Sequence, residues 1–442
     1  MSPNLLFASE LLDLQVAPER WRIWGIRGAV SILDQGLTSG AGFLVNLLLA
    51  RWLVSEAYGA FAVAFAVLLF LFGFHSALLL EPMSVVGPSS YADRINAYFV
   101  SQLKLHAALA TVLSAILLLA TAIMAQIGMH RELVLATLGS GLALPFILLL
   151  WLVRRMCYVA HRPSMAAWGS AGYLAFVATG LFLLRATNWL NPFSAFLLMG
   201  AGSIPAVLLL FWQLGLLEGT TSSPCPWRLV LQENWQYGRW IVASTVLFTI
   251  VAQTQTYMTA ALLGLGATGI LRAVQIPSLA MTQIVTAVGL LVLPTMASEF
   301  GAGSISALKR KALLSTTLLT MMSLTYTVAL AFFAKPIEHL LFAGKFCAYA
   351  WLIPVLGLVP VCTGFAMGFS MALRASQKPQ FDLLANAVSA PIALISAIVF
   401  IKLWGLGGAA LSMVAGFATY SLVYLWTFKT LDTNNFRSSV VA

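Results

Sequence analysis

Residues 59–80 read GAFAVAFAVLLFLFGFHSALLL, a run of 22 residues without Asp, Glu, Lys or Arg. An α-helix needs about 20 apolar residues to cross the hydrocarbon core of a bilayer, so this stretch is long enough for one crossing. The whole chain has the same character, because only 38 of its 442 residues are charged (24 basic, 14 acidic) and 60% are hydrophobic. Soluble domains carry roughly 25% charged residues. The sequence therefore predicts an all-α protein that crosses a membrane many times.

Twelve stretches of this kind predict about twelve membrane-spanning helices. Their ranges are 31–53, 59–80, 105–128, 133–153, 165–184, 193–216, 240–262, 268–294, 313–334, 350–373, 383–402 and 407–428. Such continuous apolar runs favour helices over the alternating strands of membrane barrels. Prolines inside or beside the helices mark either a transport pathway or a packing kink. They are Pro145, Pro205, Pro277, Pro294, Pro354 and Pro360.

The basic residues orient the chain. With residues 1–30 in the cytoplasm, 17 Lys or Arg fall on the cytoplasmic side and 7 on the other, as the positive-inside rule favours. The 17 are Arg20, Arg22, Arg27, Arg94, Lys104, Arg154, Arg155, Arg162, Arg228, Arg239, Lys309, Arg310, Lys311, Arg374, Lys378, Lys429 and Arg437. We therefore expect both termini in the cytoplasm. The net charge of +10 then reflects topology, and no nucleic-acid partner is predicted.

The first thirty residues and the cysteines carry little functional signal. Residues 1–30 do not resemble a signal peptide, because Glu10, Asp13 and Glu19 interrupt the apolar residues and no basic region precedes them. An interfacial helix or a loose tail fits better. The four cysteines lie far apart without CxxC or Cys/His spacing, so neither a disulfide framework nor a metal site is predicted, and no cofactor is expected.

The chain repeats itself at an offset of about 210 residues. ARWLVSEAYG (50–59) matches AALLGLGATG (260–269) at Ala50, Leu53, Ala57 and Gly59, and Pro82 corresponds to Pro294. Each half holds six predicted helices, so the repeat is parallel, with its axis along the membrane normal. The predicted organisation is a cytoplasmic segment 1–30, a six-helix bundle 31–217, a cytoplasmic linker 218–239, a second six-helix bundle 240–429 and a cytoplasmic tail 430–442.

One motif imitates a nucleotide-binding fingerprint. GLGATG (264–269) matches GxGxxG, but it bridges two predicted membrane helices rather than following a strand in a βαβ unit. We interpret it as a glycine-rich turn. A Walker A lysine, HExxH and GxSxG are also missing from the sequence, so an ATP-driven pump and the usual hydrolases are not indicated.

Polar residues inside the predicted helices are the candidate substrate-binding groups. They share helical faces in the first, seventh and eighth spans. They are Gln35 and Asn46 in the first span, Thr249, Gln253 and Thr256 in the seventh, and Arg272 and Gln275 in the eighth. The alternative is hydrogen bonding between helices, which is routine for small polar residues in membrane bundles.

Arg272 is the strongest single candidate. Arginines inside a membrane are costly and usually face the protein interior, although this one could also snorkel to the outer interface. Arg51, at the outer end of the first span, is a weaker substrate-binding candidate with the same alternative. His75 and Asp34 are candidate gating or proton-linked groups, and a packed neutral histidine is the alternative for His75.

Residues 33–61, LDQGLTSGAGFLVNLLLARWLVSEAYGAF, resemble the opening of bacterial polysaccharide-export proteins, which belong to the multidrug/oligosaccharidyl-lipid/polysaccharide (MOP) superfamily with the Wzx-type O-antigen flippases. HSALLLEPMSVVGP (75–88) also resembles a signature of one branch. The segment around Arg272 and Pro277 is similar to the eighth helix of lipid II flippases, in which the arginine faces the central cavity. The resemblance covers nearly the whole chain and implies a MATE-like fold of two bundles.

Two departures from the patterns of related transporters restrict the class of substrate. Lipid II flippases carry an Arg-Asp pair on the first helix where this chain has Val45 and Asn46, which argues against lipid II. Cation-coupled drug exporters of the superfamily place carboxylates within their bundles, whereas here Asp34 lies at the cytoplasmic end of the first span. A multidrug antiporter is therefore the second interpretation.

The resemblance implies a flippase that moves a polyprenyl-pyrophosphate-linked oligosaccharide across the bacterial inner membrane for O-antigen, capsule or exopolysaccharide biosynthesis. Its expected partners are the lipid-linked oligosaccharide and membrane lipids, with a polysaccharide polymerase or chain-length machinery left open. A further alternative is a membrane polymerase or ligase. Such an enzyme needs catalytic groups in an outer loop, and loop 335–349 offers only Glu338 and His339. We therefore predict a transporter and not an enzyme.

Overall fold

The computed structural model describes residues 29–216, 225–376 and 380–430, and within these ranges every regular element is helical. Residues 1–28 and 431–442, predicted as a cytoplasmic segment and tail, lie outside the described residues. The first described helix is Ala29–Trp52. The others are α2 (Ser55–His75), a π-helical turn η1 (Ser76–Leu80), α3 (Glu81–Ser90), η2 (Ala92–Arg94), α4 (Ile95–Gln126), α5 (Arg131–Val159), α6 (Pro163–Ala186), α7 (Pro192–Leu214), α8 (Trp227–Gly301), α9 (Ile305–Phe342), η3 (Cys347–Tyr349), α10 (Leu352–Ala375) and α11 (Gln380–Thr430).

Ten of the described helices are long and apolar enough to cross a membrane, and two of them contain a glycine with non-helical backbone angles. In α8 this residue is Gly264 (φ 88°), and in α11 it is Gly405 (φ 56°). Both angles lie in the left-handed region that favours glycine. At each point the chain reverses, so α8 and α11 each contribute two of the twelve predicted spans. We call residues 227–263 the first arm of α8 and residues 265–301 its second arm.

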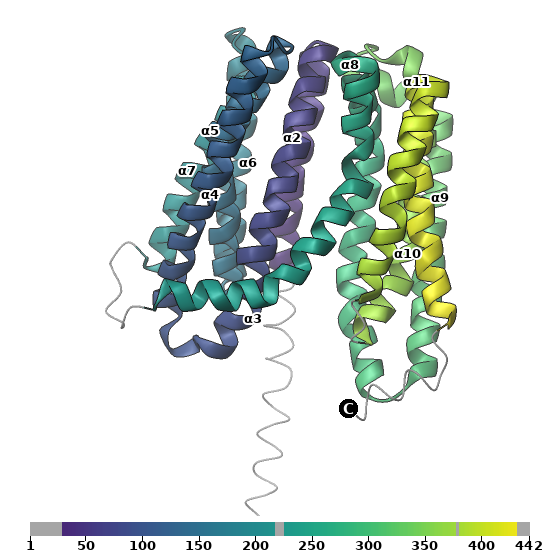
Figure 1. Ribbon diagram of the computed structural model, residues 1–442. Helices are drawn as coiled ribbons and strands as arrows, with labels where there is room; N and C mark the ends of the chain where they lie inside the picture. Colours follow the sequence, from purple (N-terminus) through teal and green to yellow (C-terminus); the bar gives the residue numbers. More distant parts are fainter. Residues whose placement is uncertain (1–28, 217–224, 377–379, 431–442) are drawn as a thin grey trace, which may run out of the picture.

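The helices form two bundles that stand side by side (Figure 1). The N-terminal bundle contains the first helix through α7, and the C-terminal bundle contains the second arm of α8 with α9, α10 and α11. The first arm of α8 crosses between them and packs on α2 as well as on α11. We call the end that holds residues 29 and 430 the base and the opposite end the top (Figure 1). The predicted fold class of two helical bundles is confirmed.

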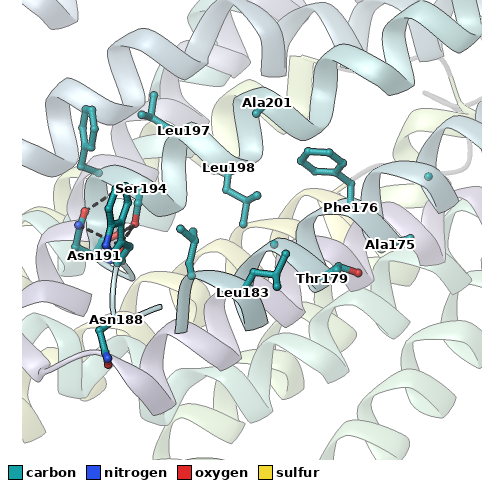
Figure 2. Close-up of a pocket in the computed structure, with 15 residues that line it drawn as sticks. Ala175, Phe176, Thr179, Leu183, Asn188, Asn191, Ser194, Leu197, Leu198 and Ala201 are labelled. Atoms are coloured by element: carbon teal, nitrogen blue, oxygen red, sulfur yellow. Dashed lines mark hydrogen bonds between the residues drawn. The ribbon is translucent and has the colours of Figure 1, made fainter. Parts of the chain in front are cut away.

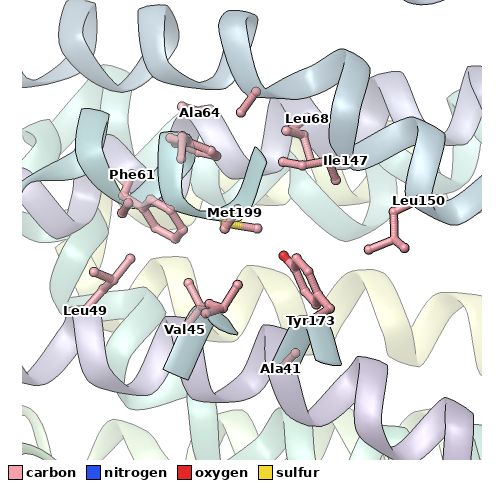
Figure 3. Close-up of a cluster of buried hydrophobic side chains, with 14 of the residues drawn as sticks. Ala41, Val45, Leu49, Phe61, Ala64, Leu68, Ile147, Leu150, Tyr173 and Met199 are labelled. Carbon is pink, nitrogen blue, oxygen red and sulfur yellow. The ribbon is translucent and has the colours of Figure 1, made fainter. Parts of the chain in front are cut away.

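Apolar side chains fill the N-terminal bundle (Figure 3). Val45 of the first helix, Phe61 of α2 and Met199 of α7 are all buried there. The ring centroid of Phe61 lies 4.7 Å from that of Phe196 on α7. Because the helices touch through such large apolar groups, the polar residues in the same interior need specific partners, and their contacts are informative.

A reciprocal contact near the top relates the two bundles. A Cβ atom at Gly59 would overlap the backbone oxygen of Leu265, and a Cβ atom at Gly269 would overlap that of Ser55. Ser55 and Leu265 are 210 residues apart, as are Gly59 and Gly269, so each half presents the same pair of residues to the other. The contact has the symmetry that the sequence repeat predicts, and it requires glycine because backbone meets backbone.

Two basic residues close the top further. Arg51 donates a hydrogen bond to the carbonyl of Leu340 on α9 (Nη1 to O, 3.2 Å). Lys345, after α9, donates to the carbonyls of Ala50 (Nζ to O, 2.9 Å) and Leu53 at the end of the first helix. Burial lowers the pKa of Lys345, while the nearby Glu56 opposes that shift. The top is therefore held by contacts between the two bundles.

At the base, the beginning of α8 is attached to the N-terminal bundle (Figure 1). Glu233 accepts a hydrogen bond from Tyr91 (2.9 Å), and Asn234 exchanges hydrogen bonds with Gln102 of α4 (3.1 and 3.3 Å). Burial and the bond to Glu233 raise the pKa of Tyr91. The predicted linker 218–239 is thus helical from Trp227 onward and packs against the first bundle.

Candidate functional site

Arg272 lies in the second arm of α8, and its side chain is buried. The guanidinium donates a hydrogen bond from Nη1 to Oε1 of Gln275 at 3.0 Å. The amide of Gln275 in turn donates to the sulfur of Met413 on α11 (Nε2 to Sδ, 3.3 Å). The two residues that the sequence spacing puts on one helical face are therefore in direct contact.

Two tyrosines connect Arg272 with the N-terminal bundle. Tyr58 of α2 and Tyr257 of the first arm of α8 are both close enough to the guanidinium to interact with it electrostatically. Tyr58 also donates a hydrogen bond to Oδ1 of Asn46 in the first helix, at 3.4 Å. We call Asn46, Tyr58, Tyr257, Arg272 and Gln275 the arginine cluster. Its side chains come from both bundles, so the affinity for a ligand bound there would depend on the relative positions of the bundles.

No carboxylate of the described residues forms an ion pair with Arg272. The residue follows Gly264 by eight positions, which is about 12 Å of helix rise from the top. Its bond to Gln275 directs the guanidinium away from the top rather than toward it. A buried charge without a counter-ion is unfavourable. An anion that entered the arginine cluster would therefore be strongly stabilised by this side chain.

Beside the cluster, the first arm of α8 buries polar atoms that have no hydrogen-bond partner in the described part of the chain. They are Oε1 of Gln253, both amide atoms of Gln255 and the hydroxyl of Thr259. Thr256 is buried in the same stretch. Because an unpaired buried polar group costs about 1–3 kcal/mol, these groups would gain from a hydroxyl-rich ligand.

Besides Gln253 and Thr256, three more of the predicted substrate-binding residues lie outside the arginine cluster. Gln35 is exposed on the first helix, with its amide 3.4 Å from the hydroxyl of Ser39. The hydroxyl of Thr249 donates to the backbone carbonyl of Thr245 at 2.8 Å, a bond within its own helix. Arg51 is at the top, in the closing contact described above. The structure thus brings Asn46, Arg272 and Gln275 together. Gln35, Thr249 and Arg51 lie away from them.

Asp34 is completely buried near the base of the N-terminal bundle. Its carboxylate forms an ion pair with Arg154 of α5 (2.6 Å) and accepts hydrogen bonds from Tyr158 (2.6 Å) and from Ser170 of α6 (2.5 Å). The hydroxyl of Ser170 also accepts a bond from Thr38. This network joins the first helix to α5 and α6, and it leaves Asp34 with three partners.

His75 is buried at the end of α2, with its Nε2 2.9 Å from Nδ1 of His106 on α4. The residues predicted from the sequence do not include His106, Tyr58, Tyr257 or Met413. A histidine or tyrosine within an otherwise apolar span was a usable signal for all except Met413. What the sequence lacked was the identity of the neighbouring helix.

A separate feature is an apolar groove of about 1110 Å³ between α6 and α7 (Figure 2). Phe176, Leu183 and Leu198 line it, and Asn188 and Asn191 lie at one end. None of the predicted site residues lines it. Its apolar walls suit a hydrocarbon chain, as any groove on a membrane helix pair does, so it gives no information about a polar substrate.

Glu338, His339 and Cys347 come close enough together to hold a metal ion. Both oxygens of Glu338 are already used, since Oε1 accepts from the backbone N–H of Phe346 (2.7 Å) and Oε2 from the thiol of Cys347 (2.8 Å). The hydrogen bond to Glu338 raises the pKa of Cys347. Glu338 and His339 were predicted to lie in a loop, but they lie in the last turns of α9. The carboxylate of Glu338 stabilises the turn that follows this helix.

Solved membrane transporters have the same fold. The chain superposes on an inward-facing multidrug resistance MATE family transporter of the MOP superfamily with a TM-score of 0.78 and 13% identity, covering 92% of this chain and 99% of that one. An outward-facing structure of such a transporter gives 0.67, with 14% identity and coverage of 93% and 96%. The lipid II flippase MurJ, in an inward closed conformation, gives 0.69, with 14% identity and coverage of 93% and 90%.

No protein-family model and no curated protein sequence matches the chain. The structural likeness therefore defines the class: a multi-pass membrane protein with the fold of MOP superfamily transporters. That fold includes both MATE multidrug transporters and a lipid flippase. The fold alone does not identify a substrate, so the substrate has to be argued from the arginine cluster.

Proposed function

We propose that the protein flips a polyprenyl-pyrophosphate-linked oligosaccharide from the cytoplasmic to the outer leaflet of the bacterial inner membrane, for the synthesis of a surface polysaccharide. The observation that carries this proposal is the buried guanidinium of Arg272 between two bundles, which forms no ion pair within the described residues. A pyrophosphate would supply the missing negative charge through charge-assisted hydrogen bonds to the planar guanidinium.

The groups around Arg272 suit the rest of such a substrate. Gln275 provides an amide bonded to the guanidinium, Asn46 provides one bonded to Tyr58, and Gln253 and Thr256 lie along the first arm of α8. Oε1 of Gln253 has no partner among the described residues, so it could accept a bond from a sugar hydroxyl. The lipid chain would remain in the bilayer. A membrane potential that is negative inside would favour outward movement of the anion by roughly 2.3 kcal/mol per charge per 100 mV.

Alternating access would occur by rocking of the two bundles. The top is closed by Gly59, Gly269, Arg51 and Lys345, so in the orientation that the basic residues predict, the structure is closed to the outside. Its higher TM-score with an inward-facing transporter, 0.78 against 0.67, supports this assignment. With the base in the cytoplasm, both termini, the linker 218–239 and the tail 430–442 would lie there.

The two alternatives find less support. A cation-coupled drug antiporter needs an available carboxylate, and Asp34 is held by Arg154, Tyr158 and Ser170. A polymerase or ligase needs an acid and a base that act together outside the membrane. Both oxygens of Glu338 are engaged, so the exposed His339 has no available carboxylate within residues 335–349. Neither alternative accounts for an unpaired buried arginine.

The proposal is tested by Arg272→Ala in cells whose surface polysaccharide depends on this protein. We expect surface polysaccharide to be lost and lipid-linked glycan to accumulate inside, with protein abundance near wild type. Arg272→Lys should recover only part of the export, because lysine lacks the planar fork of donors. Arg185→Ala, which removes an exposed arginine at the end of α6, is the matched control and should export normally. Normal export by Arg272→Ala at equal abundance would refute the assigned site.

A further inference from the structure

The His75–His106 pair lies one layer behind the crossing of α2 and α8. A Cβ atom at Gly73 would meet the side chain of Thr245, and the backbone oxygen of Ala77 lies where a Cβ atom of Gly238 would stand. Gly73 and Ala77 are four residues apart on one face of the helix and both contact the first arm of α8, whereas His75 between them points into the N-terminal bundle. The π-helical turn η1 begins directly after His75, at Ser76. Turns of this kind are frequent at functional sites.

The hydrogen bonds of the pair fix where the protons are. The ring of His106 also faces the backbone carbonyl of Pro145 on α5, and because proline has no N–H, the tautomer of His106 that suits this contact carries its N–H on the nitrogen directed there. A neutral imidazole has one N–H, so Nδ1 of His106 is then an acceptor. It accepts from Nε2 of His75 at 2.9 Å. Nδ1 of His75 is left as a lone pair, and it is buried without any partner.

No other charge compensates the pair. Its neighbours are η1, α4, α5 and the first arm of α8. Among the described residues of these elements, the only titratable group that acts on either ring is the other ring, and the only further polar group that acts on the pair is the backbone of Pro145. Protonation of Nδ1 of His75 would leave both existing hydrogen bonds intact and would add one uncompensated positive charge to an apolar layer.

We propose that His75 and His106 form a proton-binding site, with Nδ1 of His75 as the atom that takes the proton, and that proton binding disfavours the top-closed conformation. One N–H bond forms on His75, and the proton comes from hydronium in water that reaches the pair. Both rings are buried in this conformation, so a charged pair is stable only where the packing of α2 against α4 or α8 has changed and water is admitted. By linkage, the proton then favours that altered packing by the same free energy. The site is independent of the substrate, and only its role in transport rests on the proposed function.

The proton is tested directly by ¹⁵N-histidine NMR of the full chain in nanodiscs. The chain has five histidines, and the three outside the pair are exposed. Substituting them (His130→Gln, His161→Gln and His339→Gln) leaves only the signals of the pair. We expect one bare imidazole nitrogen to become protonated on acidification, with one proton taken up per pair. A pair that stays neutral down to about pH 4.5, or that takes up two protons, would overturn the site.

The linkage is tested by pulsed electron paramagnetic resonance without substrate. Spin labels at Asp93→Cys and Ala302→Cys, exposed at the base of the two bundles, report their separation in a background free of the four native cysteines. Acidification should shift the distance distribution of the wild type. His75→Asn and His106→Asn should each abolish at least half of that shift, whereas His161→Asn should keep it. A wild type without a pH-dependent shift, or a full shift in both asparagine variants, would overturn the linkage. Neither result depends on whether Arg272→Ala exports glycan.

Discussion

Asp34 and Arg272 are both buried charged residues, yet their surroundings are opposite. Asp34 has a cation and two hydroxyl donors within 2.6 Å of its carboxylate, all from its own bundle. Arg272 has a neutral amide at 3.0 Å, and the other members of its cluster come from both bundles. A fully paired charge inside one bundle holds helices together. A cation that has no counter-ion in the described part of the chain, and that lies between two bundles, suits the anionic ligand of the proposed function.

Removing the charge of Asp34, the paired residue of the two, should have the largest effect on the stability of the fold. Asp34→Asn leaves the partly buried Arg154 without its counter-ion, and removing one partner of a fully buried pair costs about 3–5 kcal/mol, which is an upper bound here. We expect a strong fall in the midpoint of thermal unfolding and in membrane abundance. Arg272→Ala, in contrast, removes an uncompensated charge and should unfold at or above the wild-type temperature.

Two variants control this experiment. Asp93→Asn changes an exposed carboxylate at the base and should leave the unfolding midpoint unchanged. The double variant Asp34→Leu with Arg154→Met removes both charges and should recover most of the lost stability, as replacements of buried ion pairs often do. Equal stability of Asp34→Asn and the wild type would show that the network does not hold the bundle.

The glycine contact above Arg272 provides the next test, with a smaller effect. Gly59→Ala places a methyl group where the backbone of Leu265 now lies, and overpacking of this kind costs typically 1–3 kcal/mol. We expect the top to separate, so that a disulfide between Ser55→Cys and Leu265→Cys forms more slowly. Gly40→Ala, at a position with open space beside it, is the matched control. Unchanged cross-linking in Gly59→Ala would show that the reciprocal glycine contact does not hold the top closed.

The fold was predictable from the sequence because the bilayer constrains it so strongly. Long uncharged runs can cross a membrane only as helices, and the repeat of residues 50–59 at 260–269 already implied two equivalent halves. The reversals at Gly264 and Gly405 coincide with breaks between predicted spans. Lengths were less predictable: α4 begins at Ile95 rather than near residue 105, because polar residues extend the helix beyond the apolar core.

The site was predictable only in part. Spacing along one helix correctly joined Arg272 to Gln275, since both residues belong to the same element. It could not reveal that Tyr58 links Arg272 to Asn46, or that His106 faces His75, because these pairs depend on which helices are neighbours. It also could not show that Asp34 has a cationic partner 120 residues away.

Glu338 is a third buried charged residue that can be compared with Asp34 and Arg272. Its substitution should have the smallest effect of the three, a change in the reactivity of Cys347. Its hydrogen bond raises the pKa of Cys347, so the thiolate fraction at neutral pH is low and alkylation should be slow, with a rate that rises toward alkaline pH. Glu338→Gln should lower that pKa and speed labelling by a membrane-impermeant maleimide added outside cells. Labelling of Cys347 only after the cells are opened would contradict the orientation inferred from the basic residues.

The central claim is that Arg272 binds the pyrophosphate group of the substrate, and a measurement of ligand binding tests this claim most directly. The full chain in nanodiscs would be titrated with a polyprenyl pyrophosphate and, in parallel, with the corresponding polyprenol. We predict that the wild type prefers the pyrophosphate and that Arg272→Ala weakens its binding about tenfold or more, since hydrogen bonds to charged groups contribute about 1.5–3 kcal/mol. Polyprenol binding should be the same in both proteins. Equal affinity of wild type and Arg272→Ala for the pyrophosphate would contradict the account.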